Sequence, residues 1–497
     1  MKYVCRAKIL STFAAIFQKN GRFISIMANV LKIKKGLDIK LKGKPLEVSL
    51  KGKGCESYAI VPDNYDGITP KVVARVGDKV KAGTALVMDK NHNEIKLVSP
   101  VSGEVIAVNR GEKRKVLSVV VKPDGKKQYE DFGKKNVAAM SGEEVKEAIL
   151  NGGLWPFIKQ RPYDIVARPG EEPRDIFVSA FYSAPLAPDF DYIIKGQEDD
   201  FRTGLEALAK LTKGKLFVGV KKGSVVKATI AKVVVSDASV AGSVKTTGAA
   251  IEMHEVEGPH PAGNVGVQIN RIKPVNKGDV VWTIRPDDVI LIGRLFNKGI
   301  ADFTRLVAIT GSEIEETGYI KAIAGCKIDS LIEDRDIIPG NYHYRIISGN
   351  VLTGVKVGFD DYLGVYDNQI TVIPDGDDKH EFFGWASLGF FKFTVGNTFV
   401  SSYLKFLNKE YVVDARLKGG RRAMIMSYEY DKVFPMDILP EYLLKAIIAF
   451  DIDKMENLGI YEVAPEDFAL CEVVDTSKIE IQKIVRNGLN LLYKEMN

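Results

Sequence analysis

Residues 71–121, KVVARVGDKVKAGTALVMDKNHNEIKLVSPVSGEVIAVNRGEKRKVLSVVV, decide the fold of the first part of the chain. Short runs rich in Val, Ile and Leu alternate with turns that contain Gly, Asp, Asn and Pro. β-branched side chains favour extended backbone, and the turn residues break the runs at lengths typical of strands. The stretch therefore predicts a small, tightly folded β-domain. Its expected strands are Val72–Val76, Ala85–Met88, Glu94–Val98, Val105–Val108 and Leu117–Val121.

Two half-motifs in this stretch resemble the flattened barrel of biotinyl and lipoyl carrier domains, in which two hairpin-containing halves pack on each other. They are Gly77-Asp78-Lys79-Val80 with Gly83, and Ser99-Pro100 with Gly103. A carrier also needs a lysine at the exposed hairpin tip, whose nitrogen forms the amide with the cofactor. Counting back from Ser99-Pro100 puts that tip at His92 and leaves Lys90 two residues out of register. We expect a biotinyl/lipoyl-like barrel-sandwich domain over residues 27–135, and modification of Lys90 would require a different register.

From about residue 141 the pattern changes to alternating strands and helices. Ser141 with Glu144 forms a capping-box pattern that opens a helix, and Gly152-Gly153 closes it. A buried strand, a helix with leucines at helical spacing and a second strand then follow, which together make a βαβ unit. These elements are expected at Ile176–Phe181, Asp199–Thr212 and Leu216–Val220. We therefore expect a Rossmann-like α/β domain over residues 136–305.

The loop after the first strand of this unit lacks the signature of a nucleotide-binding domain. In such domains a G-x-G-x-x-G loop follows the strand, because glycines let backbone amides reach the pyrophosphate. Here the strand runs into Tyr182–Pro188, which contains no glycine. The sequence therefore predicts the architecture without the nucleotide fingerprint.

The loop Gly258–Gly263 (GPHPAG) is the candidate site. Two prolines, Pro259 and Pro261, bracket His260 and restrict the backbone on both sides of it. One interpretation is a stiff turn with a half-buried imidazole. The other is a ligand contact, since rigid loops at strand ends of α/β sheets are where ligands bind. The candidate contacts are Gly258, Pro259, His260, Pro261 and Gly263. We predict no catalytic residues, because the sequence contains no recognisable triad, paired-carboxylate site or P-loop.

The last two parts of the chain differ in pattern. Residues 306–380 carry Val/Ile-rich strands separated by Gly turns, which favours a β-grasp-like module of the soluble-ligand-binding type. Residues 381–497 are expected to form a helical C-terminal domain. Its two clearest helices are predicted at Glu441–Leu458, after Pro440, and at Ser477–Met496, which has apolar residues along one face.

Cysteine, histidine and charge distribution exclude several classes of protein. The four cysteines stand at 5, 55, 326 and 471, and the five histidines are equally dispersed, so we predict no metal or iron–sulfur site. Isolated cysteines fit a reducing cytoplasm. The net charge of +6 arises mostly from residues 1–26, and the rest of the chain is nearly neutral. Nothing therefore suggests a nucleic-acid partner.

The first 26 residues are interpreted separately. Ile9–Phe17 is apolar but far shorter than the roughly 20 residues of a transmembrane helix, and no small-residue cleavage site follows it. We predict no transmembrane helix. Met27 opens a stretch that resembles a natural protein start. Residues 1–26 are therefore expected to be an N-terminal extension outside the fold, and a targeting or membrane-surface segment is the alternative.

The order of the predicted domains resembles the flavin-binding component of respiratory complex I and the C component of the Rnf electron-transport complex. Several strings, spread along Met27–Asn497, resemble more closely the family of the A component of the sodium-translocating NADH:quinone reductase. They are Ile33–Asp38, Ser99–Gly103, Asn109–Gly111, Gly153–Trp155, Gly258–Gly263, Arg345–Gly349, Phe383–Ala386 and Ala469–Cys471. Many such strings in a consistent order identify the chain as a member of that family.

The resemblance implies a peripheral subunit on the cytoplasmic face of the bacterial inner membrane, attached through its partner subunits. Those membrane subunits would carry the NADH site, the flavins, the iron–sulfur centre and the sodium path. The chain itself would bind no cofactor covalently and no metal. Cys471 lies where Rnf relatives have a run of cluster cysteines ending in Cys-Pro, and Asp475-Thr476 stands at that last position. A lone thiolate does not hold a cluster.

A role with ubiquinone has been attributed to this family. The resemblance therefore makes the loop of Gly258, Pro259, His260, Pro261 and Gly263 a candidate for quinone contact within a respiratory electron-transport and sodium-translocase complex. Two other functions stay open. A stand-alone NADH-oxidising flavoprotein would need a phosphate-cradling loop, and a biotinyl or lipoyl carrier would need a modified Lys90.

Overall fold

The computed structural model describes residues 29–231, 249–333, 336–338, 343–379, 388–390, 392–395, 399–407 and 409–496. The expected N-terminal extension, residues 1–26, and the string Phe383–Ala386 lie outside these ranges.

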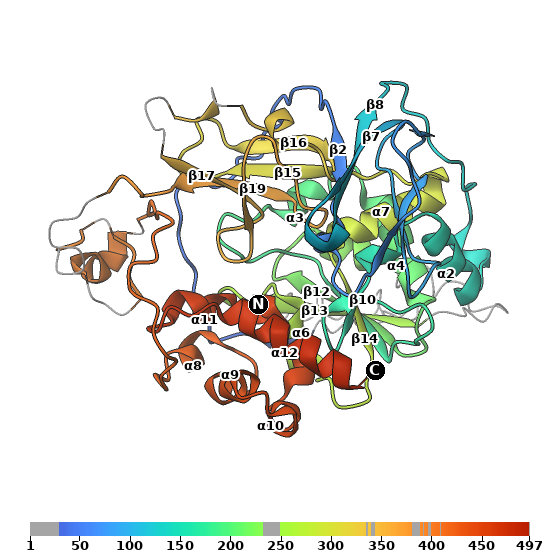
Figure 1. The fold of residues 1–497 in the computed structure, drawn as a ribbon. Coiled ribbons are helices and arrows are strands. Elements are labelled where there is room, and N and C mark those ends of the chain that lie inside the picture. Colours follow the sequence, from blue (N-terminus) through green and yellow to red (C-terminus); the bar gives the residue numbers. More distant parts are fainter. Residues whose placement is uncertain are drawn as a thin grey trace, which may run out of the picture.

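A seven-stranded sheet with strand order β1-β13-β12-β11-β14-β9-β10 forms the centre of the molecule (Figure 1). Its first five strands are parallel, and β9 and β10 add an antiparallel edge. The strands are β1 (Asn29–Lys32), β9 (Lys159–Arg161), β10 (Ile165–Val166), β11 (Asp175–Ser179), β12 (Lys215–Lys221), β13 (Ala250–Glu257) and β14 (Val281–Ile284). The predicted βαβ unit is confirmed, because β11 and β12 pair in parallel and α4 (Glu198–Ala209) connects them.

Strand β1 is a departure from expectation. It belongs to the segment expected in the barrel domain, yet it pairs in parallel with β13, with Leu31 opposite Val256. The pairing continues into the following loop, where the Ile33 amide donates to the Glu257 carbonyl at 2.8 Å. Ile33 is buried in the same apolar cluster as Val256. Strand β1 and Ile33 therefore complete the edge of the central sheet before the chain enters the barrel.

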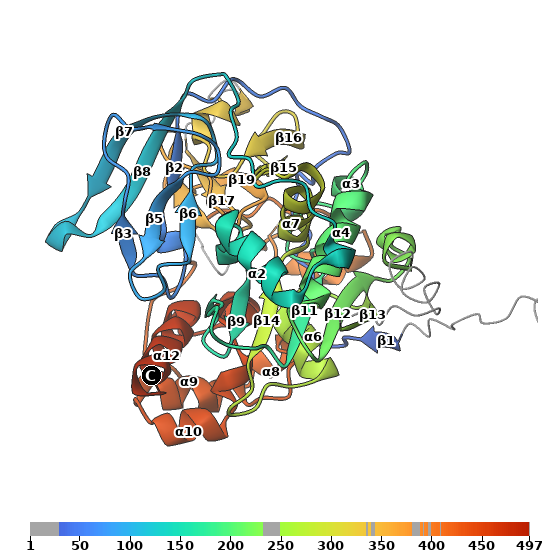
Figure 2. The same cartoon turned by 90° about the vertical axis from the view of Figure 1, so that its right-hand side faces the viewer.

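Helices cover both faces of the sheet because successive side chains of its strands point to opposite sides. Ile176 and Val178 of β11 belong to one apolar cluster, and Phe177 belongs to the other. One face carries α2 (Gly142–Asn151), α3 (Phe190–Ile193), α4 and α7 (Pro286–Lys298), and the opposite face carries α6 (Val265–Ile272) (Figure 2). The predicted capping box of α2 is confirmed, since the Ser141 and Glu144 side chains each accept the other's backbone amide.

Close contact between α4 and α7 depends on two glycines. A Cβ at Gly204 would lie 2.1 Å from the Val289 carbonyl oxygen, and a Cβ at Gly293 would lie 1.7 Å from that of Asp200. We expect Gly293→Ala to separate the helices and lower the free energy of unfolding by about 2 kcal/mol, as overpacking does. Urea denaturation measures this. Gly170→Ala is the matched control, because no atom lies within 4 Å of its added Cβ, and an equal loss in both variants would contradict the packing argument.

The barrel domain consists of two small antiparallel sheets, ordered β2-β8-β7-β4 and β3-β5-β6 (Figure 2). Their strands are β2 (Tyr58–Ile60), β3 (Pro70–Val72), β4 (Lys79–Val80), β5 (Ala85–Asp89), β6 (Lys96–Val98), β7 (Gly103–Arg110) and β8 (Val116–Pro123). The four later predicted strands are confirmed within a few residues. The first, Val72–Val76, is wrong beyond its first residue: β3 ends at Val72, and Val73 and Val76 are exposed.

The hairpin of β5 and β6 shows where Lys90 lies. The Asp89 amide donates to the Ile95 carbonyl at 3.0 Å, and the Ile95 amide donates to the His92 carbonyl at 2.9 Å. The turn is therefore centred on His92. Lys90 is exposed on the β5 side of the turn rather than at its centre.

A second mixed sheet follows the central domain, with strand order β16-β15-β19-β17-β18. It consists of β15 (Thr304–Thr310), β16 (Gly318–Ile323), β17 (Tyr344–Ser348), β18 (Val355–Val357) and β19 (Gln369–Pro374). The chain ends in α8 (Tyr430–Val433), α9 (Pro440–Ile448), α10 (Ile452–Asn457), α11 (Ala469–Val474) and α12 (Ile481–Met496). Short 3₁₀ helices occur at 62–64, 112–114, 137–139, 155–157, 328–330, 400–407, 460–462 and 465–468.

The predicted single helix Glu441–Leu458 is wrong. The structure has two helices there, α9 and α10, and Phe450 between them adopts a left-handed backbone with φ 55°. Asp451 then caps α10 by accepting the Lys454 amide at 3.1 Å. The apolar periodicity continues across the break, so periodicity alone does not reveal it. The predicted last helix is confirmed from Ile481 onward.

Candidate functional site

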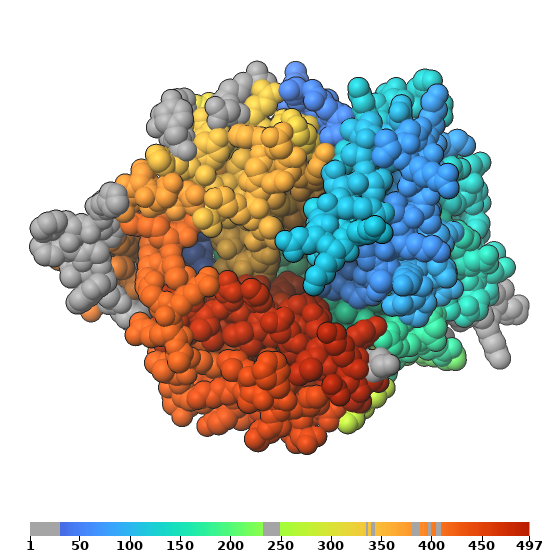
Figure 3. Space-filling view, in the orientation of Figure 1, coloured from blue at the N-terminus to red at the C-terminus, as the bar shows by residue number. Residues whose placement is uncertain are grey.

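A cavity of about 330 Å³ lies at the carboxyl ends of β11 and β14. From β11 the chain continues to β12 and β13 on one side, and it then returns through α6 to β14 on the other side. Such a change of direction leaves a crevice between the two strands, which is where open α/β sheets bind ligands. We call it the switch-point cavity. In Figure 3 the surface is hollowed between the yellow segment and the red helical end.

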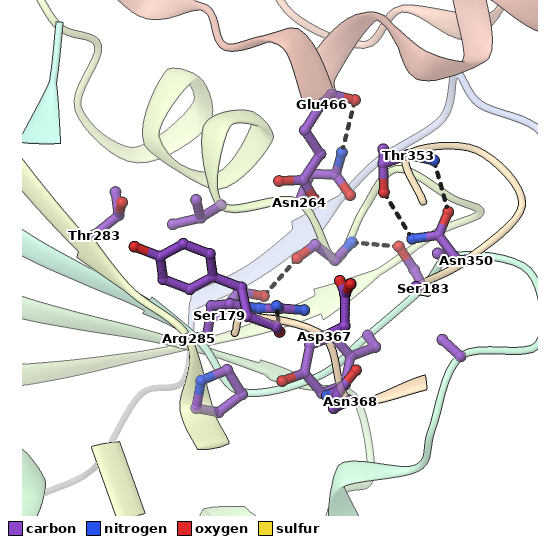
Figure 4. Close-up of a pocket in the computed structure, with 18 of the residues that line it drawn as sticks. Ser179, Ser183, Asn264, Thr283, Arg285, Asn350, Thr353, Asp367, Asn368 and Glu466 are labelled. Atoms are coloured by element: carbon purple, nitrogen blue, oxygen red, sulfur yellow. Dashed lines mark hydrogen bonds between the residues drawn. The ribbon is translucent and has the colours of Figure 1, made fainter. Parts of the chain in front are cut away.

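Three separate parts of the chain form the walls of this cavity (Figure 4). The central domain supplies the loop after β11, the start of α6 and the Arg285-Pro286 turn into α7. The five-stranded unit supplies residues 349, 350, 353 and 366–369, and the helical end supplies Pro465, Glu466 and Gln482. The cavity is therefore complete only when all three parts are in place.

The cavity is rich in aromatic groups and balanced in charge. Phe157, Phe181, Tyr182 and Tyr366 contribute rings. Its charged lining comprises three cationic and three anionic side chains: Lys159, Arg161, Arg285, Asp164, Asp367 and Glu466. Several already have partners, since Lys159 lies 3.9 Å from Asp164 and Arg285 donates to the Tyr366 carbonyl. Burial opposes the charge of Arg285, but the nearby carboxylates of Asp288 and Asp287 favour it, and the pKa of Arg285 is raised.

A buried carboxylate behind the cavity holds two of its lining residues. Asp287, in the first turn of α7, accepts hydrogen bonds from the Tyr182 hydroxyl and, at 2.7 Å, from the side-chain amide of Asn368. Burial first, and then the Asp287 charge, raise the pKa of Tyr182 well above its ordinary value, so the phenol stays protonated. One carboxylate thus joins the loop after β11 to the five-stranded unit.

A buried ion pair joins the central domain to the helical end beside the cavity. Arg161 Nη1 of β9 lies 3.0 Å from Asp467 Oδ2 and donates at 2.8 Å to the Glu462 carbonyl. The two side chains are only 2% and 1% exposed. Burial alone would lower the pKa of Arg161, but the charges of Asp467 and Asp164 raise it. The guanidinium therefore stays charged.

The predicted loop Gly258–Gly263 lies between this cavity and a second one of about 680 Å³. Gly263 lines the first cavity, whereas Gly258 and His260 line the second; Pro259 and Pro261 line neither. His260, expected to be half-buried, is only 4% exposed. Its Nδ1 lies 3.0 Å from Ser183 Oγ, and burial lowers the pKa of His260 to about 4. The imidazole is therefore neutral near pH 7.

The segment after β1 supports this loop. The His260 amide donates to Asp38 Oδ1 at 2.9 Å, and its carbonyl accepts the Leu37 amide at 2.8 Å. Gly36, at φ +146°, allows this approach, because a Cβ there would lie 2.2 Å from the His260 carbonyl oxygen. Two strings that carry the family resemblance, Ile33–Asp38 and Gly258–Gly263, are thus in direct contact.

Most of the cavity's polar lining is not predictable from the sequence. The loop Tyr182–Pro188 stands out only for its lack of glycine, yet Tyr182 and Ser183 line the cavity. Arg285-Pro286, at the end of a buried strand, is a signal that could have indicated the site, since polar residues there face the crevice. Residues such as Asn350, Asp367 and Glu466 come from other units, and the sequence offers no signal for them.

The segment around Cys471 is held by buried hydrogen bonds. Cys471 is buried in α11, and this burial raises its pKa well above the ordinary value. Asp475 accepts the Tyr430 hydroxyl at 2.7 Å and the Ile479 amide at 2.8 Å. This carboxylate therefore caps the turn into α12.

Within the described ranges, one group of side chains approaches the spacing of metal ligands: His343, Asp377 and Asp378. All three are exposed, as solvated surface charges usually are. Among the helices that the structure describes, none is long and apolar enough to cross a lipid bilayer.

Comparison with known families assigns the chain. Three family models match it: the NqrA N-terminal barrel-sandwich hybrid domain over residues 31–124, the NqrA second alpha/beta domain over 140–301, and the NQRA C-terminal domain over 306–358. Among solved structures, a chain of the NAD⁺-reducing [NiFe]-hydrogenase in the H2-reduced state aligns with a TM-score of 0.40 and 12% identity, over 72% of this chain and 62% of that chain. That similarity is too weak to add to the assignment.

Curated relatives match nearly the whole chain. The A component of the Na(+)-translocating NADH-quinone reductase of Neisseria meningitidis serogroup A is 37% identical over 469 residues, which is 94% of this chain and 100% of the relative. The protein of the same name from Yersinia pestis is 34% identical with the same coverage of both chains. At this identity and coverage, the chain belongs to the NqrA family, which supplies the A component of the Na(+)-translocating NADH-quinone reductase.

Proposed function

We propose that this chain is a non-redox subunit of a sodium-translocating NADH:quinone reductase, supporting quinone reduction that is coupled to sodium export. It acts on the cytoplasmic face of the bacterial inner membrane, where partner subunits hold it. NADH, the flavins and the iron–sulfur centre belong to those partners. Near-complete coverage of relatives that carry this name supports the assignment. We also propose that its second domain is Rossmann-like and that its third domain is β-grasp-like.

The charge balance of the switch-point cavity supports an uncharged ligand. A dinucleotide or flavin phosphate would need unpaired cations or a glycine loop to receive it. The cavity has equal numbers of cationic and anionic side chains, and the loop after β11 has no glycine. This balance speaks against the stand-alone flavoprotein. The carrier alternative is disfavoured by the position of Lys90 away from the centre of its turn.

A quinone head group fits the chemistry of the lining. Aromatic side chains suit a planar ring, which stacks on them favourably. The first residues of α6 and α7 line the cavity, and helix N-termini favour partial negative charge such as that on a carbonyl oxygen. We therefore propose the switch-point cavity as the quinone contact of this protein. Gly263 contributes to it directly, and His260 contributes from behind.

Filling the cavity tests this proposal. We expect Ala184→Trp, introduced in the intact complex, to lower quinone-dependent NADH oxidation at least tenfold, because Ala184 lines the cavity and an indole would occupy the ring's place. Ala139→Trp is the control, since Ala139 is exposed on a short turn before α2. Both variants should co-purify with integral membrane flavoproteins after gentle solubilisation.

Two outcomes would contradict the proposal. Normal quinone turnover in an assembled Ala184→Trp complex would remove the quinone from this cavity while leaving the family assignment intact. Recovery of the tagged chain alone from the soluble fraction, with bound flavin, would instead favour the stand-alone flavoprotein.

A further inference from the structure

Ser183 separates the two cavities and contacts the candidate loop. It lines both the switch-point cavity and the second cavity, and it is half-buried. Its Oγ accepts the Gly263 amide at 2.8 Å and lies 3.0 Å from His260 Nδ1 (Figure 4 shows Ser183). The serine is therefore held by two contacts from one rigid loop.

The tautomer of His260 decides what the serine hydroxyl can offer to a ligand. A neutral imidazole carries one N–H, and a hydroxyl has one donor and two acceptor positions. When Nδ1 carries the proton, Ser183 Oγ accepts from Nδ1 and from Gly263, and its own hydrogen is free to point into the cavity. When Nε2 carries the proton, the Ser183 hydrogen is donated to Nδ1, and one lone pair stays available to accept from a ligand.

We infer that the Ser183–His260 pair recognises both redox states of a quinone-type ligand by exchanging the tautomer of the imidazole. This rests on the proposed quinone contact. An oxidised quinone presents a carbonyl acceptor, and Ser183 donates to it. The reduced quinol presents a hydroxyl donor, and Ser183 accepts from it. Ser183 is the ligand contact, and His260 is a positioning residue that acts through it.

The surroundings of His260 allow this exchange. Its burial keeps the imidazole neutral at pH 7, and a protonated ring would fix Nδ1 as a donor and remove the choice. His260 also lines the second cavity, and solvent that enters this cavity offers a route for exchanging the imidazole proton. Its backbone is held at both ends by Asp38 and Leu37, so the ring does not need to move.

Variants of His260 in the intact complex test the inference. The readouts are the KM for quinone and the inhibition constant of the quinol product. His260→Asp supplies a fixed acceptor that always takes the Ser183 hydrogen, so we expect the KM for quinone to rise about fivefold while the quinol constant stays unchanged. His260→Asn, whose amide offers a donor or an acceptor, should restore the ratio of the two constants. Ser183→Ala should weaken both ligands about equally.

A merely structural role for His260 predicts a different result. In that case His260→Asp and His260→Asn would raise both constants together, which would overturn the inference. If Ala184→Trp blocks turnover but His260→Asp, made separately, leaves the ratio of the two constants unchanged, the inference is overturned and the proposed quinone cavity stands. Normal turnover in Ala184→Trp would remove both. Melting temperatures of all variants identify any that fail to fold.

Discussion

Asp467→Ala is expected to lower the free energy of unfolding by about 3–5 kcal/mol, because it leaves the buried guanidinium of Arg161 without its partner. Both side chains are almost completely inaccessible, so water cannot replace the lost carboxylate. The same Asp467 oxygen also accepts the Ala464 amide at 2.9 Å, which caps the short helix before α11. The variant should therefore detach the helical end first. Urea denaturation gives the loss of stability, and limited proteolysis between residues 409 and 496 locates it.

An exposed ion pair in the same region is the control. Arg421 and Glu480 lie 3.1 Å apart, but their side chains are 65% and 49% exposed. Glu480→Ala should leave the free energy of unfolding nearly unchanged, because water screens an exposed pair. Replacing both buried partners, as Arg161→Met with Asp467→Leu, should recover only part of the loss, because it removes the uncompensated charge but leaves the Ala464 amide and the Glu462 carbonyl without these partners. Equal effects of Asp467→Ala and Glu480→Ala would show that burial is not decisive.

Acid should destabilise the protein through His260 by about 3 kcal/mol between pH 6.5 and pH 4. Above pH 6.5 the imidazole is neutral in both the folded and the unfolded chain, so it contributes no pH dependence. As the pH falls, the unfolded chain binds a proton near pH 6.5, whereas the folded chain does so only near pH 4. The unfolded state gains that proton first, and stability is lost across this window.

The measurement is the free energy of unfolding by urea at several pH values, for the native chain and for His260→Asn. Many carboxylates also titrate on acidification, so the informative quantity is the difference between the two proteins. From pH 7 to pH 4 the native chain should lose about 3 kcal/mol more of its free energy of unfolding than His260→Asn does, because the variant has no group to protonate at this position. Parallel pH profiles would mean that the folded chain protonates His260 as readily as the unfolded chain does.

Local elements are predictable from this sequence, whereas long-range relations are not. Strands β11 and β12, helix α4 and the capping box of α2 follow from residue patterns within a few positions, and the structure has them. Strand β1 could not be assigned to its sheet from the sequence. Its partner β13 lies more than two hundred residues away, and no local residue pattern predicts that pairing. The break at Phe450 escapes prediction because its left-handed backbone lacks the glycine that usually marks one.

The candidate site shows the same limit. The prolines around His260 indicate a rigid loop, and the structure puts that loop beside the switch-point cavity. Whether it contacts a quinone stays a prediction. The rest of the lining comes from three parts of the chain, and their meeting depends on tertiary contacts such as those of Asp287 and Asp467. The residue types at those positions do not indicate, in a single sequence, that these three parts of the chain contact one another.

Because the cavity walls come from three units, its occupancy and the arrangement of those units are thermodynamically linked. A ligand that contacts all three walls binds best when they are assembled, and it stabilises that arrangement by mass action. At a hundred times its dissociation constant, such a ligand would contribute roughly 2.7 kcal/mol to holding the three parts together. If that ligand is the quinone proposed above, the quinone concentration that the complex meets would set both the stability of this three-part arrangement and the rate of turnover.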